Sequence, residues 1–362
     1  MGEFLTEYGL FLAEAVTVVL AILAVIAGIV MLTAHRKPHG HEGEIEVTSL
    51  NDELDHMRHV MEQAILDKAE YKALLKEEKK KEKAEAKARK KQLAGRGKKE
   101  DEAEESAERD KRYFVLDFDG DIKASEVEPL REEINAVLSL AEADDEVVLR
   151  LESAGGLVHS YGLAASQLER IKRKGIALTI CVDEVAASGG YMMACLADRL
   201  LAAPFAIVGS IGVIAQMPNF HRLLKKNDID FEVLTAGEYK RTLTMFGQNT
   251  DKGRQKFVEE LEDTHELFKS FVAEYRSQLE IDKVATGEVW FGKRALDLNL
   301  VDELMTSDEY LLDACDQGEV FLIRYEQKKS LQEKLTDIGV NSADRVALRW
   351  WDRAMNSRFW SR

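Results

Sequence analysis

The sequence predicts an α/β domain with a mostly parallel sheet, preceded by one transmembrane helix and a charged, partly helical linker. From about Tyr113 onward, short apolar segments typical of buried strands alternate with longer segments of helical spacing, as in consecutive βαβ units. A run of uncharged residues lies near the N-terminus, and a charge-dense stretch separates it from the alternating part. These three observations divide the chain into an N-terminal segment (1–14), a transmembrane helix (15–34), a linker (35–112), an α/β domain (113–326) and a helical tail (327–362).

The apolar run from Ala15 to Ala34 carries no charge. At about 1.5 Å of rise per residue, it is long enough to cross a hydrocarbon layer of about 30 Å. Acidic residues precede the run where a cleaved signal peptide would have basic ones, so we predict a retained anchor. Arg36 and Lys37 follow it, and the positive-inside tendency places the rest of the chain in the cytoplasm. Long domains override that tendency, which leaves the side of the membrane open.

The linker begins with polar residues and continues as a charge-dense stretch. Leu50, Leu54, Met57 and Met61 recur at three- and four-residue spacing, which predicts one amphipathic helix able to pair with a copy of itself. The lysine-rich stretch after it has no apolar face and is expected to be extended or locally helical, without a core. The histidines near its start either bind a metal or belong to a solvated turn, and no cysteine or carboxylate pair favours the metal: His35, His39 and His41.

Composition excludes several classes of function. The formal net charge is −16 and the pI is about 5.1, which argues against nucleic acid as the main partner. Cys181, Cys195 and Cys315 are widely spaced, so they predict neither a disulfide framework nor a metal site. The ATP-binding pattern GxxxxGK[ST] is absent from the sequence. We therefore expect no cofactor and no ATP-driven step in this chain itself.

Within the α/β domain, strands and helices are predicted from the period of the apolar residues. The predicted strands are YFVLDF near Tyr113, Val147–Ser153, Ala177–Asp183, DFEVLT from Asp230 and Val320–Tyr325, and the predicted helices are Ser125–Ala141, Val158–Lys174 and Ser307–Cys315. In such parallel sheets, ligand sites lie beyond the carboxyl ends of the strands. Two strand ends carry clusters of glycine and serine.

Ser188 stands between a predicted strand and an apolar helical segment, next to Gly189. Unpaired N–H groups at such a corner stabilise a negative oxygen, which suits a nucleophile, although a plain N-cap serine fits the same pattern. The preceding strand ends at Gly155 and Gly156, whose N–H groups could face the same place, or which could simply form a tight turn. Together the two clusters favour an oxyanion site.

A serine nucleophile needs a neighbouring base. His159 follows the glycine turn, and Lys240 lies in a loop that opens with small residues. A lysine acts as a base when burial depresses its pKa towards neutrality. From the residues alone, an ordinary surface residue is the better explanation of either side chain.

An ordered set of motifs resolves this choice: LESAGG, AASGGYMMA, VGSIGVI, TAGEYKRTLTMFG and VWFGKRALDLNLVDEL. In this order they resemble the S49 peptidases of the signal peptide peptidase A type, over about Arg112 to Leu304. The layout, with one N-terminal span and one catalytic domain, is most similar to the shorter bacterial members of that family. The resemblance implies a ClpP/crotonase-like spiral of βαβ units and a ring-like homo-oligomer, with serine and lysine supplied by one chain or by neighbouring chains.

The resemblance also implies roles for individual residues. Ser188 is expected to be the nucleophile, Lys240 its base, and Ser210 the residue that orients the lysine. Gly156 and Gly189 are expected to be the oxyanion donors, with Gly155 shaping the turn. No metal site is implied.

The resulting hypothesis is a serine endopeptidase anchored in the bacterial inner membrane, acting on peptides such as signal-peptide remnants or unfolded segments. Two alternatives remain: a crotonase-like acyl-thioester enzyme, and a non-catalytic membrane scaffold. The tail, with Trp350, Trp351, Phe359 and Trp360, lies either at a membrane or subunit interface or on its own domain.

Overall fold

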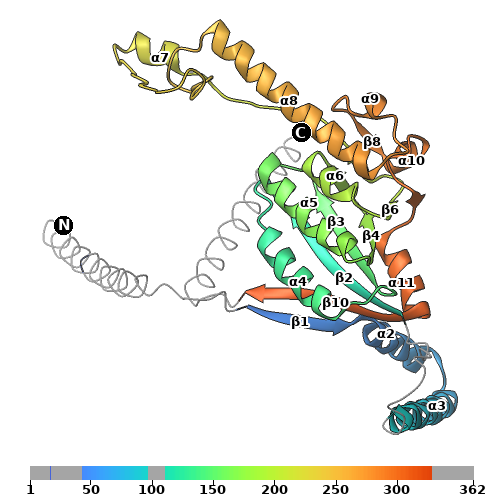
Figure 1. The fold of residues 1–362 in the computed structure, drawn as a ribbon. Helices are drawn as coiled ribbons and strands as arrows, with labels where there is room; N and C mark the ends of the chain where they lie inside the picture. The colour runs from blue at the N-terminus through green and yellow to red at the C-terminus, as the bar shows by residue number, and fades with distance from the viewer. Residues whose placement is uncertain (1–16, 18–42, 97–110, 328–362) are drawn as a thin grey trace, which may run out of the picture. The chain divides into compact units, whose positions relative to one another are not determined.

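The computed structural model describes residue 17, residues 43–96 and residues 111–327 (Figure 1). Residues 45–326 form one compact unit. The predicted anchor Ala15–Ala34 lies outside the described residues apart from Thr17, as does the tail after Gln327. In the described ranges, no helix is both long and apolar enough to span a bilayer.

One mixed sheet organises the domain, and its main path runs β1-β10-β2-β3-β4-β6-β9. From β10 to β9 every pair on that path is parallel. The strands of the path are β1 (Gly43–Ser49), β2 (Lys111–Gly120), β3 (Glu146–Ser153), β4 (Ala177–Val182), β6 (Arg199–Ala202), β9 (Glu303–Leu304) and β10 (Gly318–Gln327). The α/β prediction with a mostly parallel sheet is confirmed.

Helices cover both faces of the central strands (Figure 1). The larger core joins one face of the sheet to α4 (Val127–Leu140), α5 (Val158–Arg173), α6 (Gly189–Ala194) and α8 (Asp251–Tyr275). The smaller core packs α11 (Ser307–Gln317) on the other face. Burial from both sides explains why β2 and β3 are almost continuously apolar.

The sheet branches at the end of β3, and this branch positions the site. Residues 146–150 of β3 pair with β4, whereas Ser153 pairs with Ala186 of β5 (Val185–Ala187). Strand β5 then pairs in parallel with β7 (Ile207–Gly209), and β7 pairs antiparallel with β8 (Val289–Phe291). The short helices α9 (Ile281–Val284) and α10 (Gly292–Asp297) flank β8 in the sequence.

Two features within the predicted linker are helices. The amphipathic helix is confirmed as α2 (Leu50–Ile65), and the lysine-rich stretch forms α3 (Lys68–Arg96). Strand β1 precedes them and is not predicted by the sequence analysis. Asn51, at the start of α2, donates to the carbonyls of Cys315 and Gly318 and accepts from the N–H of Val320, which fixes α2 to α11 and β10.

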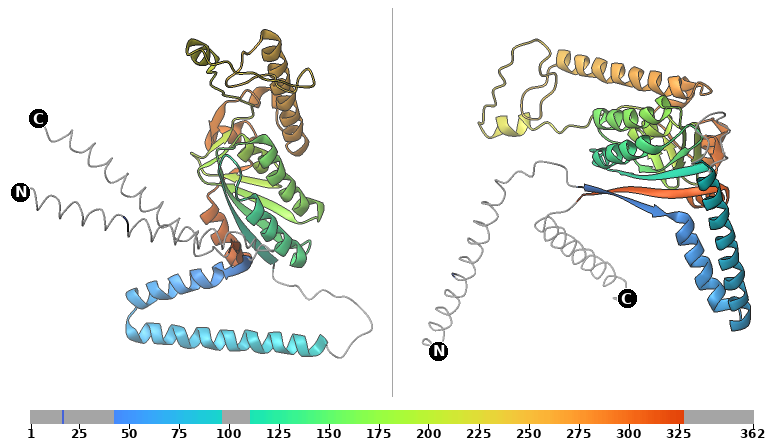
Figure 2. Two further views of the ribbon diagram at one scale, coloured as in Figure 1. Left: turned by 90° about the vertical axis from the view of Figure 1, so that its left-hand side faces the viewer. Right: turned by 60° about the horizontal axis from the view of Figure 1, so that its bottom comes forward.

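The strand predicted for DFEVLT from Asp230 is wrong for the single chain. Between β7 and α8 the structure has one regular element, α7 (His221–Lys226), and residues 227–249 form none. A strand needs a hydrogen-bonded neighbour, and residues 231–235 are exposed with no paired strand among the described residues. We call residues 211–250 the arm; Figures 1 and 2 show it extending away from the sheet and from α5 and α6.

Candidate functional site

Ser188 occupies the corner between β5 and α6 with an unusual backbone conformation, φ 52° and ψ −117°. Positive φ at a residue other than glycine costs about 1–3 kcal/mol and persists only where its surroundings impose it. Here the Ser188 N–H donates to the Gly209 carbonyl at 2.8 Å, and the Ser188 carbonyl accepts from the Met192 N–H at 3.0 Å. Ser188 is the N-cap residue of α6 by position, but its side chain makes no capping hydrogen bond, so capping does not explain the serine.

The glycine loop after β3 packs directly against this corner. Gly155 has a φ of +86°, and a Cβ there would lie 2.7 Å from the Ser188 Cβ and 2.6 Å from the Gly189 nitrogen. A Cβ at Gly156 would lie 2.1 Å from the Ile122 carbonyl oxygen. No side chain fits at either position, which is why both residues are glycine.

The N–H groups of the loop are used in different ways. The Gly155 N–H donates to the Ser153 Oγ at 3.1 Å, consistent with a role in shaping the turn. Those of Gly156 and Gly189 donate to no acceptor in the described part of the chain. These two donors, beside a half-buried serine hydroxyl, could stabilise an oxyanion formed by attack of Ser188 on a carbonyl.

Ser210 lies at the matching position on the next strand. Ala187 of β5 is in register with Gly209 of β7, so Ser188 and Ser210 follow paired residues on parallel strands, whose spacing is about 5 Å. Ser210 also has positive φ, 51°, and its N–H donates to the Glu288 carbonyl at 2.6 Å. The fold therefore brings the two predicted serines side by side.

Lys240 does not join them within the single chain. It is exposed in the arm, where its N–H closes a turn on the Gly237 carbonyl at 3.2 Å. Neither its side chain nor that of Ser188 makes a hydrogen bond among the described residues. The structure thus assembles the serines and the glycines, and leaves the predicted base outside.

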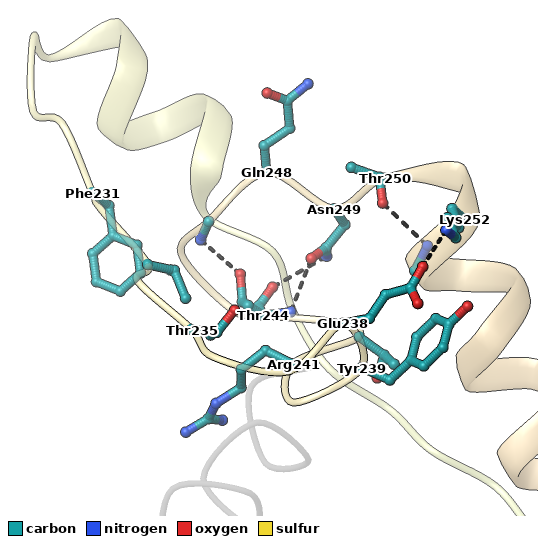
Figure 3. A pocket seen from close by; sticks show the side chains of 14 residues that line it. Phe231, Thr235, Glu238, Tyr239, Arg241, Thr244, Gln248, Asn249, Thr250 and Lys252 are labelled. Carbon is teal, nitrogen blue, oxygen red and sulfur yellow. Dashed lines mark hydrogen bonds and ion pairs between the residues drawn. The ribbon is translucent and has the colours of Figure 1, made fainter.

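The residues around Lys240 form a hollow of their own, about 330 Å³ in volume (Figure 3). Its walls are tied by polar side chains: Asn249 accepts from the Thr244 N–H at 2.8 Å and donates to the Thr244 carbonyl at 3.1 Å. Lys252 of α8 pairs with Glu238 at 2.5 Å, and this hydrogen bond lowers the pKa of the Glu238 carboxyl. The arm is therefore locally organised although little of it is buried.

The alternative base, His159, is exposed in the first turn of α5 and contacts neither serine through a hydrogen bond. His265 of α8 contacts the Ile211 carbonyl at 3.2 Å through Nε2. Over the described ranges, no group of histidine, cysteine and carboxylate side chains is arranged to hold a metal ion.

Comparison with known proteins decides the family. Residues 3–168 match the family described as peptidase family S49 N-terminal, and residues 170–320 match peptidase family S49. The probable protease SohB of Haemophilus influenzae is 51% identical over 350 residues, which cover 97% of both chains. The chain belongs to peptidase family S49. Its activity is therefore that of a peptidase.

Other S49 peptidases are similar over different lengths. The probable protease SohB of Buchnera aphidicola subsp. Schlechtendalia chinensis is 44% identical over 318 residues, 86% of this chain and 99% of that protein. Protease 4 of Haemophilus influenzae is 29% identical over 165 residues, 45% of this chain and 27% of that protein. This S49 peptidase thus matches these two SohB proteins along nearly their whole length, and protease 4 over 27% of its length.

Proposed function

We propose that this S49 peptidase is a serine endopeptidase in which Ser188 is the nucleophile and Lys240 the general base. The observation that carries the proposal is the strained corner at Ser188, where the packed glycines leave two N–H groups without acceptors. Strained backbone conformations of this kind cluster at active sites and ligand-binding sites. Lysine is proposed as the base because TAGEYKRTLTMFG, the motif that carries Lys240, resembles the loop that supplies the base in S49 peptidases.

In the proposed reaction the Ser188 Oγ attacks the peptide carbonyl carbon while the Lys240 Nζ takes the hydroxyl proton. The N–H groups of Gly156 and Gly189 stabilise the oxyanion, and the protonated lysine then gives its proton to the departing amine. In the second half of the reaction, Lys240 takes a proton from the attacking water and then gives it to the departing Ser188 oxygen, which frees the enzyme. The Ser210 hydroxyl is proposed to hydrogen-bond the Nζ and aim its lone pair, because Ser210 follows the residue that pairs with Ala187.

We propose that Lys240 reaches Ser188 in a neighbouring copy of the chain. The arm is exposed and extends away from its own sheet, and an amine loses its proton near neutral pH only when it is removed from water. Contact with a second copy would bring the Lys240 amine close to Ser188 of that copy and would also shield the amine from water. A head-to-tail arrangement of this kind closes into a ring.

The apolar run 15–34 is proposed to anchor the peptidase in the bacterial inner membrane. Because the sequence lacks an ATP-binding pattern, the substrates are proposed to be peptides that are already extended, such as signal-peptide remnants or unfolded segments.

The test is hydrolysis of fluorescein-labelled casein by the purified full-length chain and by Ser188→Ala, together with labelling by a fluorophosphonate and mapping of the labelled residue. The proposal predicts hydrolysis by the unaltered chain only, and label on Ser188. Label on another residue, or hydrolysis that survives in Ser188→Ala, contradicts it. Cleavage of acyl-thioesters but not peptides indicates the crotonase-like alternative, and inertness towards all of these indicates a scaffold.

A further inference from the structure

We infer that the hydroxyl groups of Tyr161 and Ser153 set the geometry of the oxyanion-binding loop, which makes both of them positioning residues for the reaction. The inference rests on the proposed function, because it concerns the same glycine loop. Neither residue is expected to touch substrate. They act by holding the Gly155 N–H, which shapes the turn that carries the proposed oxyanion donor, the Gly156 N–H.

Tyr161 lies beneath the corner at Ser188. It is fully buried in α5, and its ring is so close to α6 that a Cβ at Gly189 would lie 2.4 Å from its Cγ. Its other side meets Phe118 of β2 edge-on, with ring centroids 6.4 Å apart. The ring is therefore fixed by the core, and the phenol oxygen with it.

The phenol oxygen stands in a chain of hydrogen bonds with one consistent direction. Tyr161 donates its single proton to the Asp121 carbonyl at 2.7 Å. The Ser153 Oγ lies 2.5 Å from the phenol oxygen, and we assign Ser153 as the donor in that contact because the single proton of Tyr161 is given to Asp121. The lone pairs of the Ser153 Oγ then face the Gly155 N–H, which donates to it at 3.1 Å. Burial also raises the pKa of Tyr161, which keeps the phenol protonated.

These hydrogen bonds join the loop after β2 to the end of β3, and the ring of Tyr161 also contacts α6. The loop after β2 contributes Asp121, the end of β3 contributes Ser153 and Gly155, and Gly189 of α6 rests on the ring. A Cβ at Gly120 would lie 2.5 Å from the Ser153 Oγ and 2.6 Å from the phenol oxygen. The two hydroxyl groups therefore leave no room for a side chain at position 120. Without the phenol oxygen, Ser153 would turn its proton to the Gly120 carbonyl, now 3.2 Å away, and the acceptor of Gly155 would move.

The test compares steady-state hydrolysis of labelled casein by the full chain and by Tyr161→Phe, which keeps the ring but removes the oxygen. We expect kcat to fall about 10- to 100-fold while KM changes less than about 2-fold, because a misaimed N–H acts on the transition state. Ser153→Ala is expected to show the same split. The double variant is expected to be no slower than the slower single variant, because both changes interrupt the same series of hydrogen bonds.

The matched control is Tyr191→Phe. Tyr191 is also fully buried, and its hydroxyl donates to the Leu300 carbonyl at 2.8 Å, outside the hydrogen-bond chain. Its kcat is expected to stay within about 2-fold, with a loss of thermal stability similar to that of Tyr161→Phe. Equal kcat for the two tyrosine variants, a rise in KM instead of a fall in kcat, or independent losses in the double variant would overturn the inference. Activity that survives in Ser188→Ala overturns the proposed function instead.

Discussion

The corner at Ser188 and the arm that carries Lys240 are built in opposite ways. At the corner, strands from distant parts of the chain meet, glycines replace side chains, and each strained residue is held by a backbone hydrogen bond. In the arm, residues 231–240 are all exposed and the contacts are local. The half of the site proposed to hold the nucleophile is therefore organised by the chain itself, whereas the proposed base lies in a segment that its own chain leaves uncovered.

The largest expected effect is a loss of activity with little change in stability, on removal of the Lys240 side chain. Lys240→Ala should lower kcat at least about 10³-fold, because it removes the base of a unit that acts together. The midpoint of thermal unfolding should change little, since within its own chain the side chain is exposed and makes no hydrogen bond with a described residue. Casein hydrolysis and calorimetry measure the two quantities.

The control for Lys240 is Lys225→Ala, which removes another exposed lysine of the same arm, in α7. It should leave both quantities within error. Equal loss of activity in the two variants would show that the arm needs its positive charge in general and not a base at position 240.

At the corner, adding a single methyl group should lower the free energy of unfolding. Gly155→Ala forces a Cβ into backbone atoms at positive φ and should destabilise the fold by about 2–4 kcal/mol. Gly175→Ala is the matched comparison, because Gly175 has a φ of +76° and open space around the added methyl group. It should cost only about 1 kcal/mol. Denaturant unfolding of both variants gives the difference, and equal costs would mean that strain alone, without crowding, shapes the loop.

The packed region should also respond to pH through Glu133 of α4. Burial raises the pKa of this carboxyl to about 7, and its Oε2 has no hydrogen-bond partner among the described residues. The folded state thus binds the proton more tightly than the unfolded state, so the stabilisation is complete below about pH 4.5 and is lost as the pH rises through 7. Glu133→Gln carries no charge and should be more stable than the unaltered chain at pH 8 by about 1–3 kcal/mol.

Denaturant unfolding at pH 5 and pH 8 measures this effect. Glu128→Gln, at an exposed position of the same helix, should change stability by less than about 0.5 kcal/mol at either pH. A Glu133→Gln variant with the same pH dependence as the unaltered chain would assign that dependence to other groups.

The same contrast explains how far the sequence could be interpreted. Strands β2, β3 and β4 were predictable because burial on both faces makes them continuously apolar, and α4 and α5 because their apolar residues keep the helical period. Strand β1 was missed because it is a polar edge strand. DFEVLT has the composition of a strand, but pairing decides whether a strand forms, and the single chain gives it no neighbour.

Within the site, Ser188 and the glycines could be found because each follows an apolar strand, where parallel sheets place their ligands. The alignment of Ser188 with Ser210 could not, since it depends on the branch of the sheet at the end of β3. Tyr161 left no signal in the sequence at all. A tyrosine on the buried face of a helix is ordinary, and only the fold places its oxygen against Ser153 and Asp121.

The most direct test of the account is to mix two inactive chains, Ser188→Ala and Lys240→Ala, after dissociating and reassembling them together. If each site combines Ser188 of one copy with Lys240 of its neighbour, a random equal mixture in a ring should recover about one quarter of the activity of the unaltered chain. Recovery near that level supports a site in which one copy supplies Ser188 and its neighbour supplies Lys240. A mixture that assembles normally and stays inactive would contradict it.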